Sequence, residues 1–261
     1  MRRRIAVFLV LLLAVVWKFA TGSHAEEASK EQIEEEEGPV SASQFSGLIT
    51  LGSEYVFRGI SQTDENPTIQ GSFGWSHSIG VYAGVWGSNL DDGISDGNIE
   101  IDLFAGYTRD FKRVGIGDLT FDGGAIYYWY PGDDGSRPRA DFFEGFVSLK
   151  YTFSDVPLQP SIGALYNYSP DFFGEDGPGH YVSTNFNLSL PLQFGLGFEY
   201  GYQAASGGET TPNGFSYSHW KVAATKQIVG FELELNYQNT SGIDLGDLTG
   251  SRVVFLISRS F

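Results

Sequence analysis

Apolar and polar side chains alternate along segments of about ten residues, and such segments recur from residue 45 to the end of the chain. In one of them Ile99, Ile101 and Leu103 alternate with Glu100 and Asp102. Successive side chains of a β-strand point to opposite faces, so each segment predicts a strand with one apolar and one polar face. A tilted strand of about ten residues is long enough to cross a bilayer. A single segment of this kind would fit a half-buried hairpin of a soluble protein equally well. The number of repeats decides between a soluble hairpin and a membrane barrel.

The alternating segments number about twelve, an even number. We expect strands at residues 45–57, 68–76, 80–88, 98–109, 118–130, 142–153, 158–168, 180–190, 193–204, 215–226, 228–239 and 251–261. Helical periodicity is missing, and after the first 25 residues no apolar run approaches the length of a membrane-spanning helix. The sequence therefore predicts an all-β domain at residues 45–261.

The connections between these strands alternate in length. The long, polar connections, rich in Gly, Asp, Ser and Pro, are at residues 58–67, 89–97, 131–141, 169–179, 205–214 and 240–250. The very short ones are at residues 77–79, 154–157, 191–192 and 227, and the one at 110–117 is intermediate. Short turns in the periplasm and longer loops outside the cell are typical of membrane barrels. The pattern predicts a transmembrane antiparallel up-and-down β-barrel of about 12 strands.

The first 44 residues have a different composition. Residues 1–25 combine three arginines, an apolar run of about a dozen residues and an A-x-A-like end, which predicts a cleaved signal peptide rather than the alternative of an uncleaved anchor. Residues 26–44 contain seven glutamates and almost nothing apolar, which predicts a periplasmic tail or linker. A plug or a docking peptide for a basic partner is the alternative. The chain has no cysteine, which excludes disulfides and a lipoprotein-type anchor.

Closure of the barrel is a physical requirement, because an open strand edge in hydrocarbon leaves backbone groups without hydrogen bonds. The last strand must therefore pair with the first. It ends the chain on Phe261, with Val253, Phe255 and Ile257 on the same side. A terminal phenylalanine on an alternating strand is similar to the signal that outer-membrane barrels present to their assembly machinery. Arg259 departs from this apolar face, and we expect it to reach the headgroup region.

Four blocks in the first half of the barrel resemble a known family. They are SEYVFRGISQT at residues 53–63, VYAGVWGSNLDD at 81–92, IEIDLFAGYTRDF at 99–111 and AIYYWYPGDD at 125–134. In this order they are similar to the TorF-type porin family, also known as the Gcw_chp family. The resemblance implies an outer-membrane barrel and a pore. It transfers no catalytic or binding residue.

The polar face of the predicted strands carries eight acidic and four basic residues, which we expect to line the lumen. They are Glu54, Arg58, Glu100, Asp102, Asp122, Glu144, Lys150, Glu199, Lys221, Glu232, Glu234 and Arg252. Removal of the signal peptide takes four of the 16 basic residues and none of the 32 acidic ones, which leaves a net charge of −20. An acidic lumen attracts cations, and this sign excludes nucleic acid as a partner.

Catalytic and metal-binding patterns are weak. His219 shares its strand face with Tyr217 and Lys221 rather than with a serine, so the Ser–His pair of a membrane hydrolase is missing and we expect no enzyme. The acidic loop at residues 91–98 lacks the residue order of a calcium loop. Turn formation explains its acids, with loose divalent bridging to lipopolysaccharide as the alternative. We expect no metal site and no cofactor.

These patterns predict a porin in the outer membrane of a Gram-negative bacterium, for passive diffusion of small polar solutes with a preference for cations. The rival is a structural or surface-interaction barrel with a filled lumen, because Phe104, Tyr128, Phe146 and Leu165 share the inward parity. The expected partners are outer-membrane lipid and lipopolysaccharide, the barrel assembly machinery, and small polar or cationic solutes.

Overall fold

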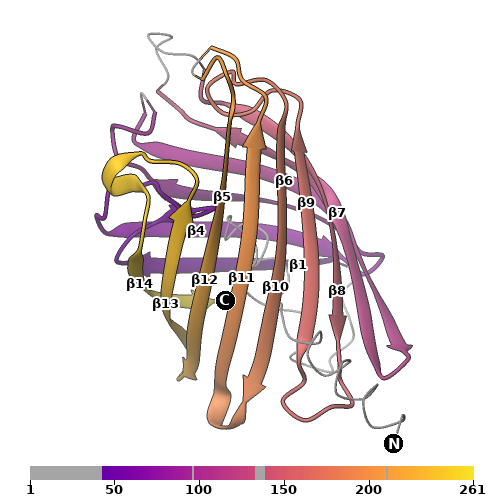
Figure 1. The fold of residues 1–261 in the computed structure, drawn as a ribbon. Coiled ribbons are helices and arrows are strands. Elements are labelled where there is room, and N and C mark those ends of the chain that lie inside the picture. The colour runs from indigo at the N-terminus through magenta and orange to yellow at the C-terminus, as the bar shows by residue number, and fades with distance from the viewer. Residues whose placement is uncertain (1–42, 96, 133–138, 210) are drawn as a thin grey trace, which may run out of the picture.

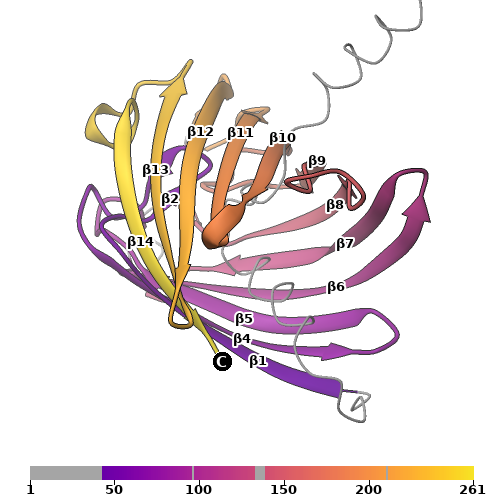
Figure 2. The same cartoon turned by 90° about the horizontal axis from the view of Figure 1, so that it is seen from below.

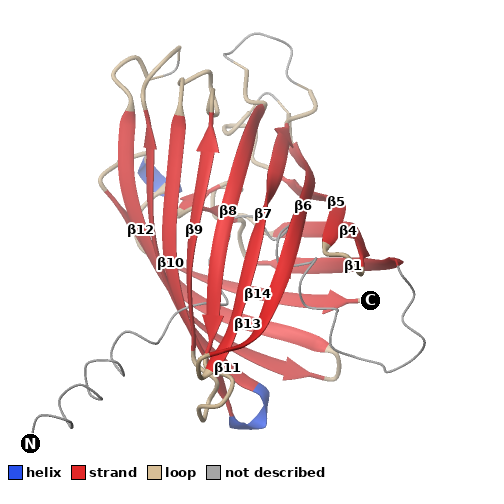
Figure 3. Cartoon of the chain, turned by 90° about the vertical axis from the view of Figure 1, so that its right-hand side faces the viewer, coloured by secondary structure: helices blue, strands red, loops and turns tan. Residues whose placement is uncertain are grey.

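The computed structural model describes residues 43–95, 97–132, 139–209 and 211–261. The predicted signal peptide and nearly all of the predicted acidic linker lie outside these residues. Among the described residues, no helix is long and apolar enough to cross a membrane. The helices of this part of the chain are two short 3-10 turns, η1 at Pro191–Gln193 and η2 at Gly246–Leu248 (Figure 3).

Twelve antiparallel strands form a closed barrel, which confirms the predicted fold class (Figure 1). Each strand pairs with the next along the chain, and the last pairs with the first. The strands are β1 (Ser43–Gly52), β4 (Thr68–His77), β5 (Val81–Asn89), β6 (Ile99–Val114), β7 (Gly117–Trp129), β8 (Phe142–Thr152), β9 (Ser161–Ser169), β10 (Gly179–Leu190), β11 (Phe194–Ala205), β12 (Phe215–Ile228), β13 (Phe231–Ser241) and β14 (Arg252–Ser260).

The outer face of the barrel is apolar and the inner face is mostly polar, as the alternation predicts. On β6, Ile99 and Leu103 are each 50% exposed, whereas Glu100 and Asp102 are at most 1% exposed. Arg259 breaks the apolar outer face, and its guanidinium lies over the ring of Phe231 at 4.9 Å. The outward residues thus form an apolar surface around the barrel, and the charged residues are turned to the lumen.

The barrel closes between β1 and β14, which lie side by side in the view from below (Figure 2). The register pairs Leu48 with Ser260 and Gly52 with Leu256. Phe261 extends this ladder beyond β14, because its amide donates to the carbonyl of Gly47 at 3.0 Å and its carbonyl accepts from Gly47 at 2.8 Å. No strand edge of the barrel is left open.

Long connections gather at one end of the barrel and short turns at the other (Figure 1). Two predicted lengths were wrong. The connection between β6 and β7 has only residues 115–116, because both strands extend further than the apolar pattern suggested. The connection between β8 and β9 instead covers residues 153–160, and it contains Pro157 and Pro160, which cannot donate to a strand ladder.

The first predicted strand was too long. β1 ends at Gly52, and the chain then turns inward into a small hairpin of β2 (Val56–Phe57) and β3 (Ile60–Ser61). In the expected strand at residues 45–57, Tyr55 and Phe57 would continue the apolar outer face, but they belong to the interior, and Tyr55 is 1% exposed. The reason is the tight turn at Arg58 and Gly59, whose positive φ angles of 47° and 84° reverse the chain where the alternation alone would continue it.

Candidate functional site

The β2–β3 hairpin lies inside the barrel. Its turn contacts strands from separate parts of the ring: Arg58 hydrogen-bonds to Glu144 on β8 and Gln203 on β11, and the carbonyl of Gly59 accepts from the hydroxyl of Thr240 on β13. A group can reach all three strands only from within the lumen. The hairpin is therefore a segment of the chain that occupies its own barrel.

An ion pair between Arg58 and Glu144 holds the hairpin in place. The two guanidinium nitrogens of Arg58 donate to the two carboxylate oxygens of Glu144 at 2.9 and 2.6 Å, a bidentate geometry. Glu144 also accepts hydrogen bonds from Asn167 at 3.0 Å and from Tyr128 at 3.3 Å. Both members of the pair are buried. Burial alone lowers the pKa of Arg58, but the Glu144 carboxylate offsets this, so that the pKa of Arg58 lies above its ordinary value.

Aromatic rings flank the guanidinium of Arg58. Its central carbon lies 4.2 Å from the ring centre of Tyr181 on β10 and 4.7 Å from that of Phe57 on the hairpin. A cation over an aromatic face gains electrostatic attraction, which increases when water is excluded. The ion pair and these rings together hold the hairpin inside the lumen.

Two further groups of lumen charges are paired. Glu54, just after β1, forms an ion pair with Arg252 on β14. Glu199 on β11 lies 3.6 Å from the amine of Lys221 on β12 and accepts a hydrogen bond from Tyr181. Arg58, Lys221 and Arg252, all predicted to be basic lumen residues, thus neutralise acidic neighbours in the barrel.

The other predicted lumen residues are also on inward positions. Glu100 and Asp102 on β6 and Asp122 on β7 are buried, and Asp122 accepts a hydrogen bond from the hydroxyl of Tyr82 at 2.8 Å. Nearer the short turns, the partly exposed residues are Lys150, Lys221, Glu232 and Glu234. The lumen is thus packed near the long loops, where the hairpin enters, and more accessible toward the short turns.

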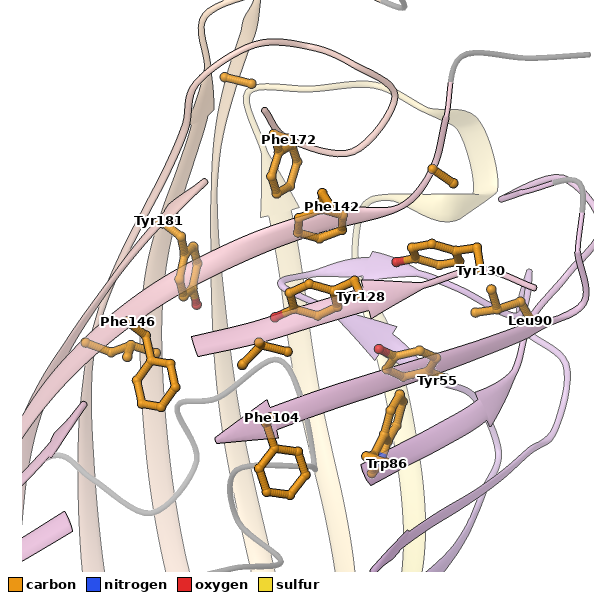
Figure 4. Close-up of a cluster of buried hydrophobic side chains, with 14 of the residues drawn as sticks. Tyr55, Trp86, Leu90, Phe104, Tyr128, Tyr130, Phe142, Phe146, Phe172 and Tyr181 are labelled. Carbon is orange, nitrogen blue, oxygen red and sulfur yellow. The ribbon is translucent and has the colours of Figure 1, made fainter. Parts of the chain in front are cut away.

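A cluster of aromatic side chains fills much of the packed half. The four residues predicted to fill the lumen are all buried in it: Phe104, Tyr128, Phe146 and Leu165. Figure 4 shows the first three of them. Phe142 stacks on Tyr128 with ring centres 4.2 Å apart, and Phe172 from the connection between β9 and β10 packs against Phe142. The long connections thus add side chains to the interior from above the strands.

Sequence reasoning missed several residues that complete this site. Tyr181, Asn167 and Gln203 all touch the Arg58–Glu144 pair or its ring contacts. Their inward strand parity was available as a signal, but strand parity cannot show which inward side chains meet a loop. His219, which shares its strand face with Tyr217 and Lys221, is buried, and its Nε2 lies 3.0 Å from the hydroxyl of Tyr181. Among the described residues, no group of three or more acidic, histidine or cysteine side chains is placed to hold a metal ion.

Comparison with known proteins gives a family match and a shared fold. The family model described as "Bacterial protein of unknown function (Gcw_chp)" matches residues 36–261. No curated protein is detectably similar in sequence. The structure titled "KdgM porin in complex with disordered oligogalacturonate" is similar with a TM-score of 0.53 and 10% identity, covering 84% of this chain and 99% of that one.

Two other porin-type structures are similar at lower scores. NanC porin has a TM-score of 0.48 at 9% identity, covering 82% of this chain and 98% of that one. OccAB3 of Acinetobacter baumannii has a TM-score of 0.45 at 9% identity, covering 86% of this chain and 66% of that one. Of the three scores only that of KdgM exceeds 0.5, and at its low identity it establishes the shared barrel fold alone.

Proposed function

The chain belongs to the Gcw_chp family, and from the contents of its barrel we propose that it is a porin-like channel of the outer membrane for small polar solutes, with a preference for cations. Its lumen is narrowed by the β2–β3 hairpin. The proposal includes export by the N-terminal signal peptide, insertion by the barrel assembly machinery through Phe261, and a surrounding of outer-membrane lipid and lipopolysaccharide.

The hairpin inside the barrel is the observation that carries the proposal. An eight-stranded barrel has an interior just wide enough for its own side chains, and diameter grows with strand number. This barrel has twelve strands and accommodates a piece of main chain as well. The hairpin is held through side-chain contacts and hydrogen bonds rather than as a strand of the barrel, so displacing it would clear a path without opening the sheet.

The balance of charges in the lumen supports cation preference. The twelve residues predicted to line it are eight acids and four bases, a net charge of 4 − 8, or −4. Arg58, Lys221 and Arg252 each form an ion pair with one of the acids, which leaves the net charge of the lumen acidic. Acidic groups on a low-dielectric wall raise the local concentration of cations.

Reversal potentials in a planar bilayer under a KCl gradient test this preference. We expect the sign of potassium selectivity, decreasing as salt is raised, because charges are screened within about 8 Å at 0.15 M salt. The double substitution Glu100→Gln and Asp102→Asn should reduce the preference more than the loop substitution Asp91→Asn and Asp92→Asn, which removes the same charge. A chloride-selective current would contradict the proposed cation preference. Equal effects of the two variants would contradict the placement of Glu100 and Asp102 along the ion path.

A barrel with a permanently filled lumen is the second candidate, and the buried aromatic cluster favours it. Such a protein would serve as a structural or surface-interaction barrel whose acidic loops bind partners. The two candidates differ in one measurable property. A filled barrel stays non-conducting when the hairpin is shortened, whereas a channel closed by the hairpin gains conductance.

A further inference from the structure

The end of the β6–β7 hairpin runs past the ring of strands at the short-turn side of the barrel. β5 pairs with β6 from Ile99 to Tyr107, and the amide of Thr108 then donates to the carbonyl of Gly80, in the turn between β4 and β5. β6 itself continues to Val114, with its other edge paired to β7. Within the described structure, no strand pairs with the β5-side edge of β6 beyond this point. The hairpin thus ends in an open strand edge outside the closed ring.

Both faces of this hairpin end are uncovered. Residues 109–116 are all exposed, whereas buried and more exposed residues alternate in the first half of β6. Phe111 and Ile116 are 46% and 54% exposed, and Asp110 and Lys112 are exposed as well. Figure 2 shows the turn between β6 and β7 apart from the turn between β4 and β5. Proteins usually cover such an open edge or protect it with charge.

Two arginines on this hairpin end have no acidic partner. Arg109 and Arg113 are exposed, and the ion pairs in the described part of the chain include neither of them. Lys112 lies 3.7 Å from Asp118, and Asp110 accepts a hydrogen bond from a hydroxyl of β7. The charged residues at positions 109–118 are three bases and two acids, a net charge of 3 − 2, or +1. The hairpin end is therefore basic in a chain whose net charge is −16.

The acidic segment at residues 26–42 joins the barrel close to this hairpin end. It contains seven glutamates and one lysine, a net charge of 1 − 7, or −6, and it directly precedes β1. Gln44 on β1 pairs with Ser76 on β4. Tyr82 on β5 pairs with Ser76 on one side and with Gly106 of β6 on the other. The start of β1 and β6 thus lie in one row of the sheet, three strand spacings or about 14 Å apart.

The direction of the chain brings the acidic segment to the open edge. β1 and β6 run in opposite directions, so the chain that precedes β1 and the end of β6 leave the ring at the same side. The open edge of β6 faces the side on which β1 lies. Five extended residues span at most about 18 Å, so residues 38–42 can bridge the distance from β1 to β6. The glutamates before them can therefore reach the hairpin end.

We propose that the glutamates of residues 26–42 dock on the hairpin end, where they pair with Arg109 and Arg113 and cover the open edge of β6. One exposed ion pair contributes little, but the direct connection to β1 keeps the segment at a high local concentration beside the arginines. A second copy of the chain would instead bring the same arginines to the edge, and like charges oppose that contact. This docking goes beyond the proposed channel function, because it does not depend on whether the lumen conducts.

Distances between two spin labels on the purified full chain, in an uncharged detergent, test the docking. The chain has no cysteine, so Ile33→Cys and Ile116→Cys place one label in the acidic segment and one on the hairpin end. At low salt we expect a population of short distances. At about 1 M salt, where charges act over only about 3 Å, this population should disappear into the broad distribution of an undocked tether.

Matched variants make the test specific. Arg109→Gln together with Arg113→Gln should lose the short distances at low salt. Replacement of the four glutamates at residues 34–37 by glutamine should lose them as well, and this change lies outside the barrel strands. The control pair Lys226→Gln and Arg259→Gln removes the same charge at the same end of the barrel, but on β12 and β14, and should keep the short distances.

An absence of short distances at low salt in the labelled chain with all charges intact would overturn the proposal. So would short distances that persist at high salt or without both arginines. Dilution of the labelled chain with unlabelled chain distinguishes docking within one chain from contact between copies. Short distances that decline on dilution would identify a second copy as the occupant and overturn the proposal, whereas distances unchanged by dilution would support it.

Discussion

Arg58 shows how a single side chain can fix a segment inside a barrel. Its guanidinium is bound in a bidentate manner by Glu144, also donates to Gln203, and lies against two aromatic rings. Glu144, Gln203 and Tyr181 belong to three strands of the barrel, and Phe57 belongs to the hairpin. Removing one charge of a buried pair leaves the other charge buried without a partner. The resulting loss in the free energy of unfolding is much larger than the net stabilisation that the intact pair provides over two neutral residues.

A double-mutant cycle on Arg58 and Glu144 tests this arrangement. Each single substitution, Arg58→Gln or Glu144→Gln, should lower the free energy of unfolding by about 3–5 kcal/mol, the usual cost of breaking a buried pair. The double variant should lose less than the sum of the two, because no buried charge is left unpaired. Urea unfolding in lipid vesicles, followed by tryptophan fluorescence, measures the losses. The exposed Arg139, changed to glutamine, serves as the control, and strictly additive losses at Arg58 and Glu144 would count against the pair.

Strand parity predicts the face on which a residue lies but not its partners across the lumen. Glu144, Glu199 and Arg252 are buried, and the alternation of apolar and polar residues along each strand indicates their face. Arg58 and Glu144 are 86 positions apart, and no local pattern reports that a loop bends back to meet a distant strand. Tyr55 was misassigned for the same reason, since its apolar ring continues the alternation of β1 although the strand has already ended.

Among the strands, β14 has a special task because it closes the ring. Phe261 extends its pairing with β1 through two backbone hydrogen bonds to Gly47. The ring of Phe261 also covers Gly47 so closely that a Cβ atom there would lie 2.5 Å from the ring. Sequence reasoning found the terminal phenylalanine, but it could not show that a glycine on the first strand makes room for it.

Deleting Phe261 should impair assembly, because the closing strand loses two backbone hydrogen bonds and its terminal ring. The amount of folded barrel in isolated outer membranes measures the effect. Phe261→Tyr, which keeps the backbone and an aromatic ring, should assemble near the normal level. Accumulation of the shortened chain at the same level as the full chain would show that Phe261 is dispensable.

The strand count and the sorting of loops were predictable because both depend on local patterns. Twelve alternating segments gave twelve barrel strands, and the order along the chain is the order around the ring. The exact ends were harder, since Pro157 and Pro160 delay the start of β9 while β6 and β7 extend through polar residues. Turn chemistry rather than hydrophobic periodicity determines such ends.

The closed barrel as a whole predicts resistance to detergent. All twelve strands are paired on both sides, so unfolding must break a continuous ring of backbone hydrogen bonds. We expect the protein to fractionate with outer membranes and to migrate faster on a detergent gel when unboiled than when boiled. Recovery as a soluble periplasmic protein, with one gel position under both conditions, would rule out the membrane barrel.

The path through the barrel depends on the hairpin, and the structure offers a conservative way to remove it. The amide of Gln62 donates to the carbonyl of Tyr55 at 2.8 Å, so the two ends of the hairpin segment are adjacent. Residues 56–61 can therefore be replaced by a two-residue Asn-Gly turn, which suits such a narrow hairpin. The exchange keeps Tyr55 and the Glu54–Arg252 ion pair but removes Arg58.

Single-channel recording of this shortened variant beside the wild type, in planar bilayers under a KCl gradient, tests the central claim most directly. The account predicts a larger conductance for the shortened variant than for the wild type, with a reversal potential of the sign of potassium preference. A correctly folded shortened variant that remains non-conducting, or that prefers chloride, would contradict it.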